Sequence, residues 1–398
     1  MKMIVRHKKN PIIKPRDVKP TRDGYKVLGA FNPGAVNFGD EIILLVRVAE
    51  GCEPREGYVR TPVCRFEDDG DGTGDGTGDG TAVPDILEFK ASDPAVTLKD
   101  TRAVAYKGRE FLSTLSHIRV ARSRDGVNFT VEDEPFIYPA CEAERYGVED
   151  ARVTFIDGKY YINYTAVSED SWATALAVTE DFKNLERKGL IFCPENKDVA
   201  IFPEKVGGKY VALHRPNNSG FGKPAIWYAE SPDLLHWGNH KCVLRTRDRE
   251  SKRKEENWES ERVGAGAPPI KTSEGWLVIC HGKGADDAYS LFCLLLDLEE
   301  PFRVVRRASV PLLTPTEPYE TEGFFGNVVF SNGVVEREQE REREREQERE
   351  REREQERERE REQERKQDGD GKVFLYYGAS DESVCVAVTD VESLLDSF

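Results

Sequence analysis

The chain has 398 residues, a formal net charge of −16 and a hydrophobic fraction of 38%. A chain of this length can bury a large core, and its acidic balance argues against nucleic acid or an anionic membrane as a partner. The first residues lack the apolar segment of a signal peptide, and no apolar run is long enough to cross a bilayer. We therefore expect a cytoplasmic protein.

Two segments of biased composition interrupt the chain. Residues 1–40 are expected to be a lead-in across the body of the protein, and the first strong strand begins at Asp40. Residues 52–115 are expected to form an irregular insertion, in which Asp-Gly-Thr units over 68–81 predict a flexible loop. These units lack the ligand pattern of a calcium loop, so we expect no metal. Residues 336–367 are almost entirely Glu, Arg and Gln, and should loop away from the core as a solvated helix or a disordered arm.

A repeated pair of strands predicts the fold. One member is a strand led by glycine, with copies that begin at Gly158, Gly208, Gly275 and Gly371 and a looser copy at Asp40. The other is a strand that ends in a small residue and an acid, with copies that end at Asp125, Asp181, Asp233 and Asp390 and a weaker copy at Asp297. Amphipathic helical patterns are nearly absent, and the spacing is that of four-stranded blades. The repeat predicts an all-β fold, a five-bladed β-propeller forming a single domain over residues 1–398, and fits a two-sheet sandwich poorly.

The sequence Tyr-Gly-Val-Glu-Asp-Ala-Arg over residues 146–152 places two adjacent carboxylates and an arginine just before a strand. Because neighbouring side chains in a strand point to opposite faces, Glu149 and Asp150 are expected in different environments, with Asp150 and Arg152 on one face. Burial and a fixed guanidinium shift a carboxyl pKa in opposite directions, which can tune an acid for proton transfer. The alternative is an ordinary ion pair at a strand entrance.

A second group of polar residues is expected at the mouth of the propeller channel, which the inner strand of each blade lines. The Gly-led strands end in groups that suit this mouth, among them Arg47, His214, Arg215, His281 and Asp381. Stretches over 195–198 and 259–262 lie between the repeat units and contribute Lys197 and Arg262. Each residue alone could be a surface charge or a strand-end salt bridge. Together they predict a mostly cationic funnel that suits an anion beside a polyhydroxylated ligand.

Several ordered motifs resemble those of glycoside hydrolase family 130, the inverting β-mannoside phosphorylases and related mannosidases. The acid motif of that family usually reads Asp-Pro-Arg, and here Ala151 replaces the proline, which removes a φ restraint but keeps the acid and the arginine. The other motifs are Phe-Asn-Pro-Gly at 31–34, Leu-Val-Arg at 45–47, His-Arg-Pro at 214–216, Gly-Ala-Gly at 264–266, Cys-His-Gly at 280–282, a Gly-Phe-Phe-Gly-Asn run at 323–327 and a Tyr-Tyr-Gly-Ala-Ser-Asp run at 376–381. The resemblance spans roughly residues 25–390 outside the two biased segments.

The resemblance implies a reaction and a set of site residues. Asp150 would be the general acid, acting on the departing oxygen through the mannose 3-hydroxyl, while inorganic phosphate attacks the anomeric carbon from the opposite face. The product would be α-mannose 1-phosphate, with phosphate as co-substrate and no other cofactor. The residues that match the phosphate site are Lys197, Arg215, Arg262 and His281. Those expected to hold the manno-oligosaccharide are Asn32, Arg47, Arg152, His214, Tyr289 and Asp381.

Two alternatives stay open. A β-mannosidase would use Glu259 or Glu261 as a base, and a non-catalytic sugar-binding propeller would need neither the acid nor the phosphate site. A hydrolase needs a second carboxylate to activate water, whereas phosphate is already a nucleophile and needs cations to hold it. The cationic set therefore favours the phosphorylase. The linkage (β-1,2 or β-1,4), the acceptor sugar and the oligomeric state, a homo-oligomer included, are left open.

Overall fold

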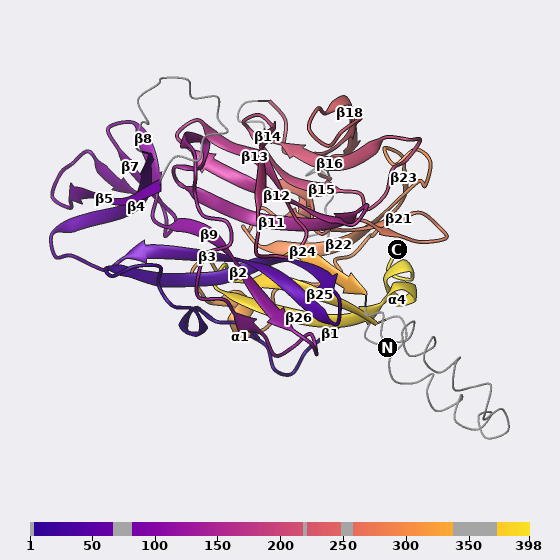
Figure 1. The fold of residues 1–398 in the computed structure, drawn as a ribbon, viewed down its shortest axis with the longest axis horizontal. Coiled ribbons are helices and arrows are strands. Elements are labelled where there is room, and N and C mark those ends of the chain that lie inside the picture. Colours follow the sequence, from indigo (N-terminus) through magenta and orange to yellow (C-terminus); the bar gives the residue numbers. More distant parts are fainter. Residues whose placement is uncertain (1–3, 67–81, 218–220, 248–257, 337–371) are drawn as a thin grey trace.

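The structure is a computed structural model that describes residues 4–66, 82–217, 221–247, 258–336 and 372–398. Its described part consists mainly of strands, arranged as five four-stranded antiparallel blades in a ring (Figure 1). This confirms the expected five-bladed β-propeller. The loop expected over 68–81 and the Glu/Arg-rich segment beyond Glu336 lie outside the described residues.

Blades two, three and four are each built from strands that follow one another in the chain, whereas blade one is interrupted by the insertion and blade five takes one strand from the N-terminus. Blade one contains β2 (Tyr25–Phe38), β3 (Glu41–Cys52), β9 (Leu115–Ser123) and β10 (Thr130–Val131). Blade two contains β11 (Gly147–Ile156), β12 (Lys159–Ser168), β13 (Ser171–Thr179) and β14 (Glu186–Phe192). Blade three contains β15 (Asn196–Ile201), β16 (Tyr210–Pro216), β17 (Ile226–Ser231) and β18 (Gly238–Leu244).

Blade four contains β19 (Arg262–Ala265), β21 (Trp276–Lys283), β22 (Tyr289–Leu296) and β23 (Val304–Arg307), with the short β20 (Ile270–Lys271) beside β21. Blade five contains β24 (Val329–Glu336), β25 (Lys372–Ala379), β26 (Ser383–Asp390) and the N-terminal β1 (Val5–Arg6). Among the described residues, the α-helices are α1 (Pro318–Thr321) and α4 (Val391–Leu395), and 3-10 turns occur at Pro15–Asp17 and Glu142–Glu144. Within the described ranges, no helix is long and apolar enough to cross a membrane.

The repeat seen in the sequence corresponds to the second and third strands of the blades. The Gly-led strands are β12, β16, β21 and β25, with β3 as the looser copy, and each is the second strand of its blade. The expectation that these strands line the channel was therefore wrong by one strand. The innermost strands are β2, β11, β15, β19 and β24. Four of them carry bulges and polar residues, which interrupt the regular pattern by which a strand is recognised.

The acid at the end of the third strand is explained by the turn that follows it. In blade two, Asp181 Oδ1 accepts hydrogen bonds from the backbone N–H groups of Lys183 and Asn184, both at 2.8 Å. These bonds lower the pKa of Asp181 to about 2. Asp125 and Asp233 accept backbone hydrogen bonds in the same pattern. The small-x-acid signal is therefore an Asx-type turn that leads into the fourth strand.

The N-terminal segment closes the ring. Strand β1 pairs with β26 in the register Val5 to Val388, so the last blade takes its fourth strand from the start of the chain. In Figure 1 the indigo N-terminal strands lie beside the yellow C-terminal ones. The lead-in expected over residues 1–40 thus supplies strands to two blades, including the 14-residue β2.

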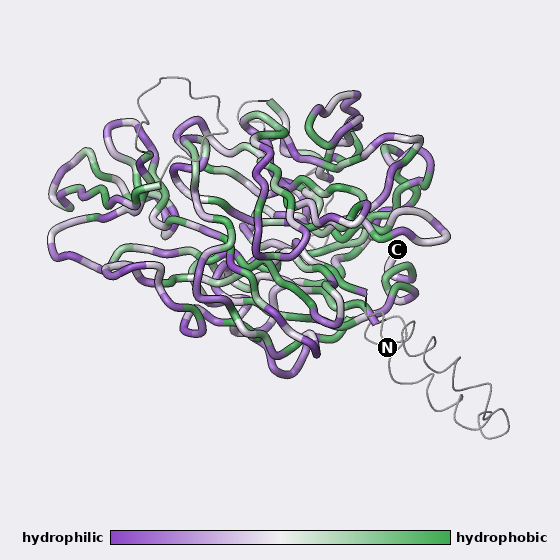
Figure 2. Tube along the Cα trace, in the orientation of Figure 1, coloured by the Kyte–Doolittle hydropathy of each residue, from purple (hydrophilic) through white to green (hydrophobic). Residues whose placement is uncertain are grey.

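The insertion of blade one contains regular strands, where the sequence predicted an irregular segment. Strands β4 (Tyr58–Phe66) and β5 (Ala82–Lys90) pair with each other, and β6 (Val96–Leu98), β7 (Ala103–Tyr106) and β8 (Arg109–Leu112) form a three-stranded sheet. Buried Val63 and Phe111 pack with Tyr146 and Val167 of blade two, which anchors the insertion. It lies at the end of the molecule opposite α4 (Figure 1). Apolar residues gather along the strands and polar ones in the outer loops (Figure 2).

Candidate active site

Three inner strands present a polar side chain at an equivalent point. Asn32 on β2, Asp150 on β11 and Asp198 on β15 each lie where the register with the second strand shifts. Their φ angles are 46°, 51° and 55° respectively. Asn and Asp tolerate this left-handed conformation better than other residues with a side chain, and a bulge turns a side chain out of the strand alternation. The backbone itself therefore aims these three groups.

Asp150 is buried, with 3% of its surface exposed, and is surrounded by donors and cations. Asn32 Nδ2 donates to Asp150 Oδ1 at 3.0 Å, and Arg47 Nη1 lies 3.2 Å from the same oxygen. Lys197 Nζ lies 3.6 Å from Oδ2. Burial acts to raise the pKa of Asp150, but Arg47, Lys197 and the Asn32 hydrogen bond outweigh it. The pKa is therefore lower than that of an ordinary aspartate, and the carboxyl is ionised when the site holds no ligand.

The bulge at Asp150 also contradicts one prediction, which concerned Glu149 and Asp150. Arg47 Nη2 lies 2.8 Å from Glu149 Oε1, so one guanidinium binds both Glu149 and Asp150. The prediction that these neighbours have separate environments was wrong, because the register shift at Asp150 breaks the strand alternation. Arg152 does not bind the Asp150 carboxylate as expected; its Nη1 donates to the backbone oxygen of Asp150 at 3.1 Å.

Asp198 is a buried hub that joins three blades. Arg215 Nε donates to Asp198 Oδ2 at 2.5 Å, and His281 Nε2 lies 3.1 Å from the same oxygen. Arg152 Nη2 donates to Oδ1 at 3.3 Å. Burial acts to raise the pKa of Asp198, but Arg215, His281 and Arg152 hold it well below the usual range. Asp198 thus fixes the orientation of Arg152, Arg215 and His281, which come from blades two, three and four.

The sequence analysis did not select Asp198 as a site residue, although it lies in the polar stretch 195–198. The signal that could have found it is positional. Asn32, Asp150 and Asp198 each lie on the innermost strand of a blade, ahead of the second strand of the same blade. Comparing those equivalent positions between blades would have singled out the third acid.

Arg152 ties blade two to blade four. Besides its contact with Asp198, its Nε donates to the backbone oxygen of Gly266 at 2.8 Å, and Nη2 donates to that of Ala265 at 3.1 Å. Its exposed fraction is 1%. Because its donors are directed at protein atoms, Arg152 is placed to position the site rather than to contact a sugar.

His214 is also engaged by protein groups at both ring nitrogens. Its Nδ1 lies 2.9 Å from Asn196 Nδ2, and its Nε2 lies 3.0 Å from His240 Nδ1. Its ring stacks on Phe192 with the centroids 4.7 Å apart. Burial, and then the charge of His240, lower the pKa of His214 to about 3. His214 is therefore neutral and supports the strand that carries Asn196.

His281 is fully buried and lies between Asp198 and Gly264. Burial lowers the pKa of His281, although Asp198 acts in the opposite direction. A Cβ at position 264 would lie 2.6 Å from Asp198 Oδ2. The Gly-Ala-Gly motif is thus explained by the close approach of β19 to this pair.

The remaining expected site residues come from blades four and five. Arg262 is half-buried at the start of β19, and its Nε has no hydrogen-bond acceptor among the described residues. The ring of Tyr289 lies 6.2 Å from that of His281. Asp381 lies in the turn between β25 and β26, and burial raises its pKa to about 6, against the effect of Arg47 and together with that of Asp150. Asp381 and Asp150 therefore face one electrostatic environment.

The two glutamates considered as a hydrolytic base lie elsewhere. Glu259 is buried and forms ion pairs with Arg247 and with Arg307, which is on the outermost strand β23. Glu261 pairs with Lys223 at 3.3 Å. These contacts direct both carboxylates to partners outside the clusters of Asp150 and Asp198.

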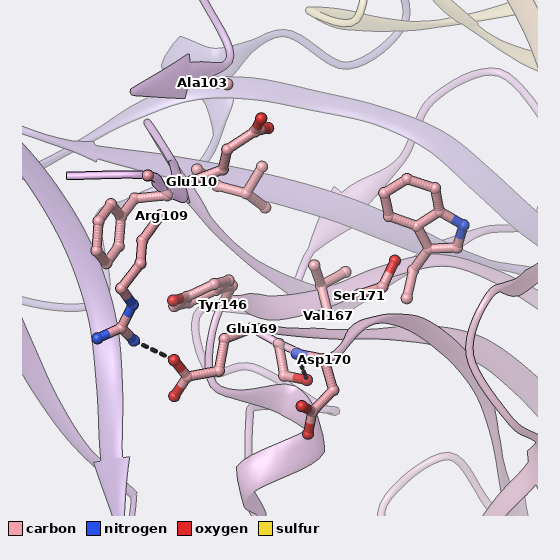
Figure 3. Close-up of a pocket in the computed structure, with 13 residues that line it drawn as sticks. Ala103, Arg109, Glu110, Tyr146, Val167, Glu169, Asp170 and Ser171 are labelled. Carbon is pink, nitrogen blue, oxygen red and sulfur yellow. Dashed lines mark hydrogen bonds and ion pairs between the residues drawn. The ribbon is translucent and has the colours of Figure 1, made fainter. Parts of the chain in front are cut away.

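A cavity of about 570 Å³ lies between the insertion and blade two (Figure 3). Its lining includes Tyr146, Val167 and the ion pair of Arg109 with Glu169. None of the residues that contact Asp150 or Asp198 lines it. The cavity is therefore distinct from the acid and cation site.

The fold and the site define a class of protein: a five-bladed β-propeller with a buried acid beside clustered cations, an arrangement suited to chemistry on a glycoside. The family model described as β-1,4-mannooligosaccharide phosphorylase, of glycoside hydrolase family 130, matches residues 91–341. The chain belongs to glycoside hydrolase family 130.

Two curated relatives and one solved structure are similar over most of the chain. A β-1,2-mannobiose phosphorylase of Listeria innocua is 43% identical over 338 residues, which is 84% of this chain and 90% of that protein. A 1,2-β-oligomannan phosphorylase of a Thermoanaerobacter species is 35% identical over 70% of this chain and 80% of its own. The structure of β-1,2-mannobiose phosphorylase from Listeria innocua in complex with β-1,2-mannobiose has a TM-score of 0.83 and 38% identity, covering 99% of this chain and 98% of that one.

Proposed function

We propose that this protein is an inverting phosphorylase that transfers a mannosyl unit from a β-mannoside to inorganic phosphate and forms α-mannose 1-phosphate. The observation that carries the proposal is the buried Asp150 carboxyl beside Lys197, which in turn adjoins the Asp198 cluster of cations. The similarity to β-1,2-mannobiose and 1,2-β-oligomannan phosphorylases favours a β-1,2 linkage in the substrate.

The proposed roles follow from the contacts. Asp150 donates the proton, and Asn32, Arg47, Tyr289 and Asp381 surround the mannosyl unit. A dianion needs cations that are already oriented, since each charge-assisted hydrogen bond is then made without reorganisation. We assign this task to Lys197, Arg215, Arg262 and His281. Arg152 and His214 act indirectly, by positioning Asp198 and Asn196, with which they interact.

Lys197 links the acid to the anion site. Its Nζ lies 3.6 Å from the Asp150 carboxyl and helps to keep that group ionised. Phosphate bound to Lys197 would offset this positive charge, which raises the pKa of Asp150 and lets it hold a proton. The transfer then balances: the C1–O bond to the leaving sugar breaks, the proton moves to that oxygen, and a phosphate oxygen bonds to C1 from the opposite face.

A β-mannosidase is the second candidate, and the positions of its expected bases weigh against it. Glu259 is paired with Arg247 and Arg307, and Glu261 with Lys223. A hydrolase also has no use for an oriented set of cations.

The testing experiment incubates the protein with β-1,2-mannobiose and β-1,4-mannobiose, with and without phosphate. We expect α-mannose 1-phosphate only when phosphate is present, and faster from the β-1,2 substrate. Mannose released at the same rate without phosphate would establish a hydrolase. Sugar binding without either product would establish a non-catalytic propeller.

The Asp150→Asn variant should keep the fold, measured by circular dichroism, and lose turnover by a factor of about 10³ or more, because the proton donor is absent. Wild-type rates in this variant would remove Asp150 from the reaction. The single domain, the homo-oligomer and the cytoplasmic location stay predictions.

A further inference from the structure

The insertion of blade one contacts a segment of blade five that borders the site. Thr101 Oγ1 donates to the backbone oxygen of Phe324 at 2.9 Å. The guanidinium carbon of Arg102 lies 3.8 Å from the centroid of the Phe325 ring. Asp100 holds Arg102 in place, since its Oδ2 lies 2.9 Å from Arg102 Nη2. Two segments that are far apart in the sequence therefore meet through a stacked arginine and phenylalanine.

The segment over residues 323–327, which we call the rim segment, lies directly beside Asp381. Phe325 N donates to the backbone oxygen of Ser380 at 2.9 Å. A Cβ at position 323 would lie 2.6 Å from Ser380 Cβ, so the glycine there permits this close packing. The rim segment is the Gly-Phe-Phe-Gly-Asn motif, to which the proposed mechanism assigns no role.

Arg102 also affects the pKa values of two acids, Asp381 and Asp287. Burial raises the pKa of Asp381 to about 6, and Arg102 acts against that rise together with Arg47. Lys283 lowers the pKa of Asp287, and Arg102 and Arg262 add to that effect. The guanidinium of Arg102 thus lies within electrostatic range of acids of blades four and five.

Arg102 and the acid lie at different depths. The side chain of Arg102 is 44% exposed, whereas that of Asp150 is 4% exposed. If the mannosyl unit lies between Asp150 and Asp381, the sugar joined to it by the glycosidic bond lies toward the solvent-exposed side of the site. The groups that border this side next to Asp381 include Arg102 and Phe325.

We propose that Arg102 and Phe325 form the subsite for the leaving sugar, which in the reverse reaction is the acceptor, and that they select this sugar. The proposal rests on the phosphorylase function. A planar guanidinium offers several N–H donors to the hydroxyl groups of a pyranose, and the aromatic ring offers an apolar surface to its C–H face. Stacking on Phe325 holds the guanidinium in one orientation, which reduces the entropy lost when the sugar binds.

The test uses the reverse reaction, in which the hydroxyl oxygen of mannose attacks C1 of α-mannose 1-phosphate and inorganic phosphate is released and measured. In Arg102→Ala we expect the KM for the acceptor mannose to rise about tenfold, as for one lost charge-assisted hydrogen bond. The KM for α-mannose 1-phosphate should stay within about twofold, since that ligand binds at the deep cations. Arg102→Lys should recover part of the loss, and Phe325→Leu should show a smaller rise of the same kind.

The matched control is Arg109→Ala, which removes an arginine of the same insertion whose partner Glu169 lies at the separate cavity (Figure 3). It should leave both KM values unchanged. An unchanged acceptor KM in Arg102→Ala, or an equal rise in Arg109→Ala, would overturn the subsite while leaving the phosphorylase intact. A wild-type protein that releases no phosphate from α-mannose 1-phosphate and mannose would overturn both proposals.

Discussion

At the scale of single residues, the site depends on backbone conformation as much as on side-chain chemistry. Asn32, Asp150 and Asp198 share a left-handed φ and a register shift on the innermost strand of three blades. These bulges interrupt the regular strand pairing, and they direct three polar groups toward a common region. Burial then makes each charge depend on its partners, as the opposite pKa shifts of Asp150 and Asp381 show.

The raised pKa of Asp381 predicts a pH-dependent stability. Between its ordinary value of 3.8 and about 6, the folded protein binds a proton that the unfolded chain releases, so the contribution of Asp381 to stability falls as pH rises through this interval. Burial is the main cause of this rise; Asp150 and Glu149 add to it, whereas Arg47 and Arg102 act against it. We expect the Tm of Asp381→Asn minus that of the wild type to increase from about pH 4 to pH 6 and then level off.

Thermal melts in phosphate-free buffers measure this difference. The control is Asp181→Asn, since the pKa of Asp181 is lowered to about 2 and its own interval lies below pH 4. Its Tm difference should not change between about pH 4 and pH 6. A flat difference for Asp381→Asn as well would contradict the buried environment assigned to Asp381.

Arg215 provides the second prediction at this scale. Asp198 accepts a hydrogen bond from Arg215 Nε and Asn217 Oδ1 accepts one from Nη1 at 3.2 Å, so the guanidinium is held in one orientation, and it is proposed to bind phosphate. In Arg215→Ala, the KM for phosphate should rise by about tenfold or more, and the KM for mannobiose should change much less.

Initial rates at varied phosphate measure this effect. Arg124→Ala serves as the control, since Arg124 is exposed and pairs with Asp40 in blade one. An unchanged phosphate dependence in Arg215→Ala would place the anion elsewhere.

At the scale of elements, the last blade is completed by the two-residue strand β1. So short a pairing needs support, and Arg6 supplies it. Its Nε and Nη2 lie 2.7 and 2.8 Å from the two oxygens of Glu320, which is buried and also accepts a hydrogen bond from Tyr377 at 2.8 Å. The turn that leads to blade five and the strand that completes it are thus joined by one carboxylate.

Removing Arg6 should therefore destabilise the whole propeller. Arg6→Ala leaves the buried Glu320 without its cation, which costs about 2–4 kcal/mol. Urea denaturation measures this loss. Arg16→Ala is the matched control in the same segment, because Arg16 and its partner Asp17 are exposed. A loss below about 0.5 kcal/mol in Arg6→Ala would mean that closure does not depend on this pair.

At the scale of the whole molecule, every blade contributes to one site. Blade one supplies Asn32 and Arg47, and blade two supplies Asp150. Blades three and four supply Arg215 and His281, which Asp198 orients, and blade five supplies Asp381. A ligand that contacts several of these groups binds the closed ring and not the unfolded chain, so it should stabilise the fold.

We therefore expect phosphate to raise the Tm of the wild type, with a gain of about 2.7 kcal/mol at a concentration one hundred times its Kd. Differential scanning calorimetry with increasing phosphate measures this gain. In Arg215→Ala the increase should be largely lost. An equal increase in both proteins would point to phosphate bound away from the proposed anion site.

The sequence by itself determined the fold class and the family, and it predicted a set of site residues. The four glycine-led strands, the looser copy at Asp40 and the Asx-type turns are local signals, because a turn depends on a few neighbouring residues, so they could be read as a five-bladed ring. The motif around Asp150 and the ordered basic residues indicated the family, which the comparisons then showed.

Only the tertiary structure decided which groups meet. The bulge that brings Glu149 and Asp150 to one guanidinium, the hub at Asp198 and the meeting of Arg102 with Phe325 all join residues of different strands or blades. The period-two pattern of a strand does not indicate a bulge, because the position of the extra residue depends on how the neighbouring strands pair. Contacts between distant segments arise only when the ring closes, and no local pattern in the chain encodes them.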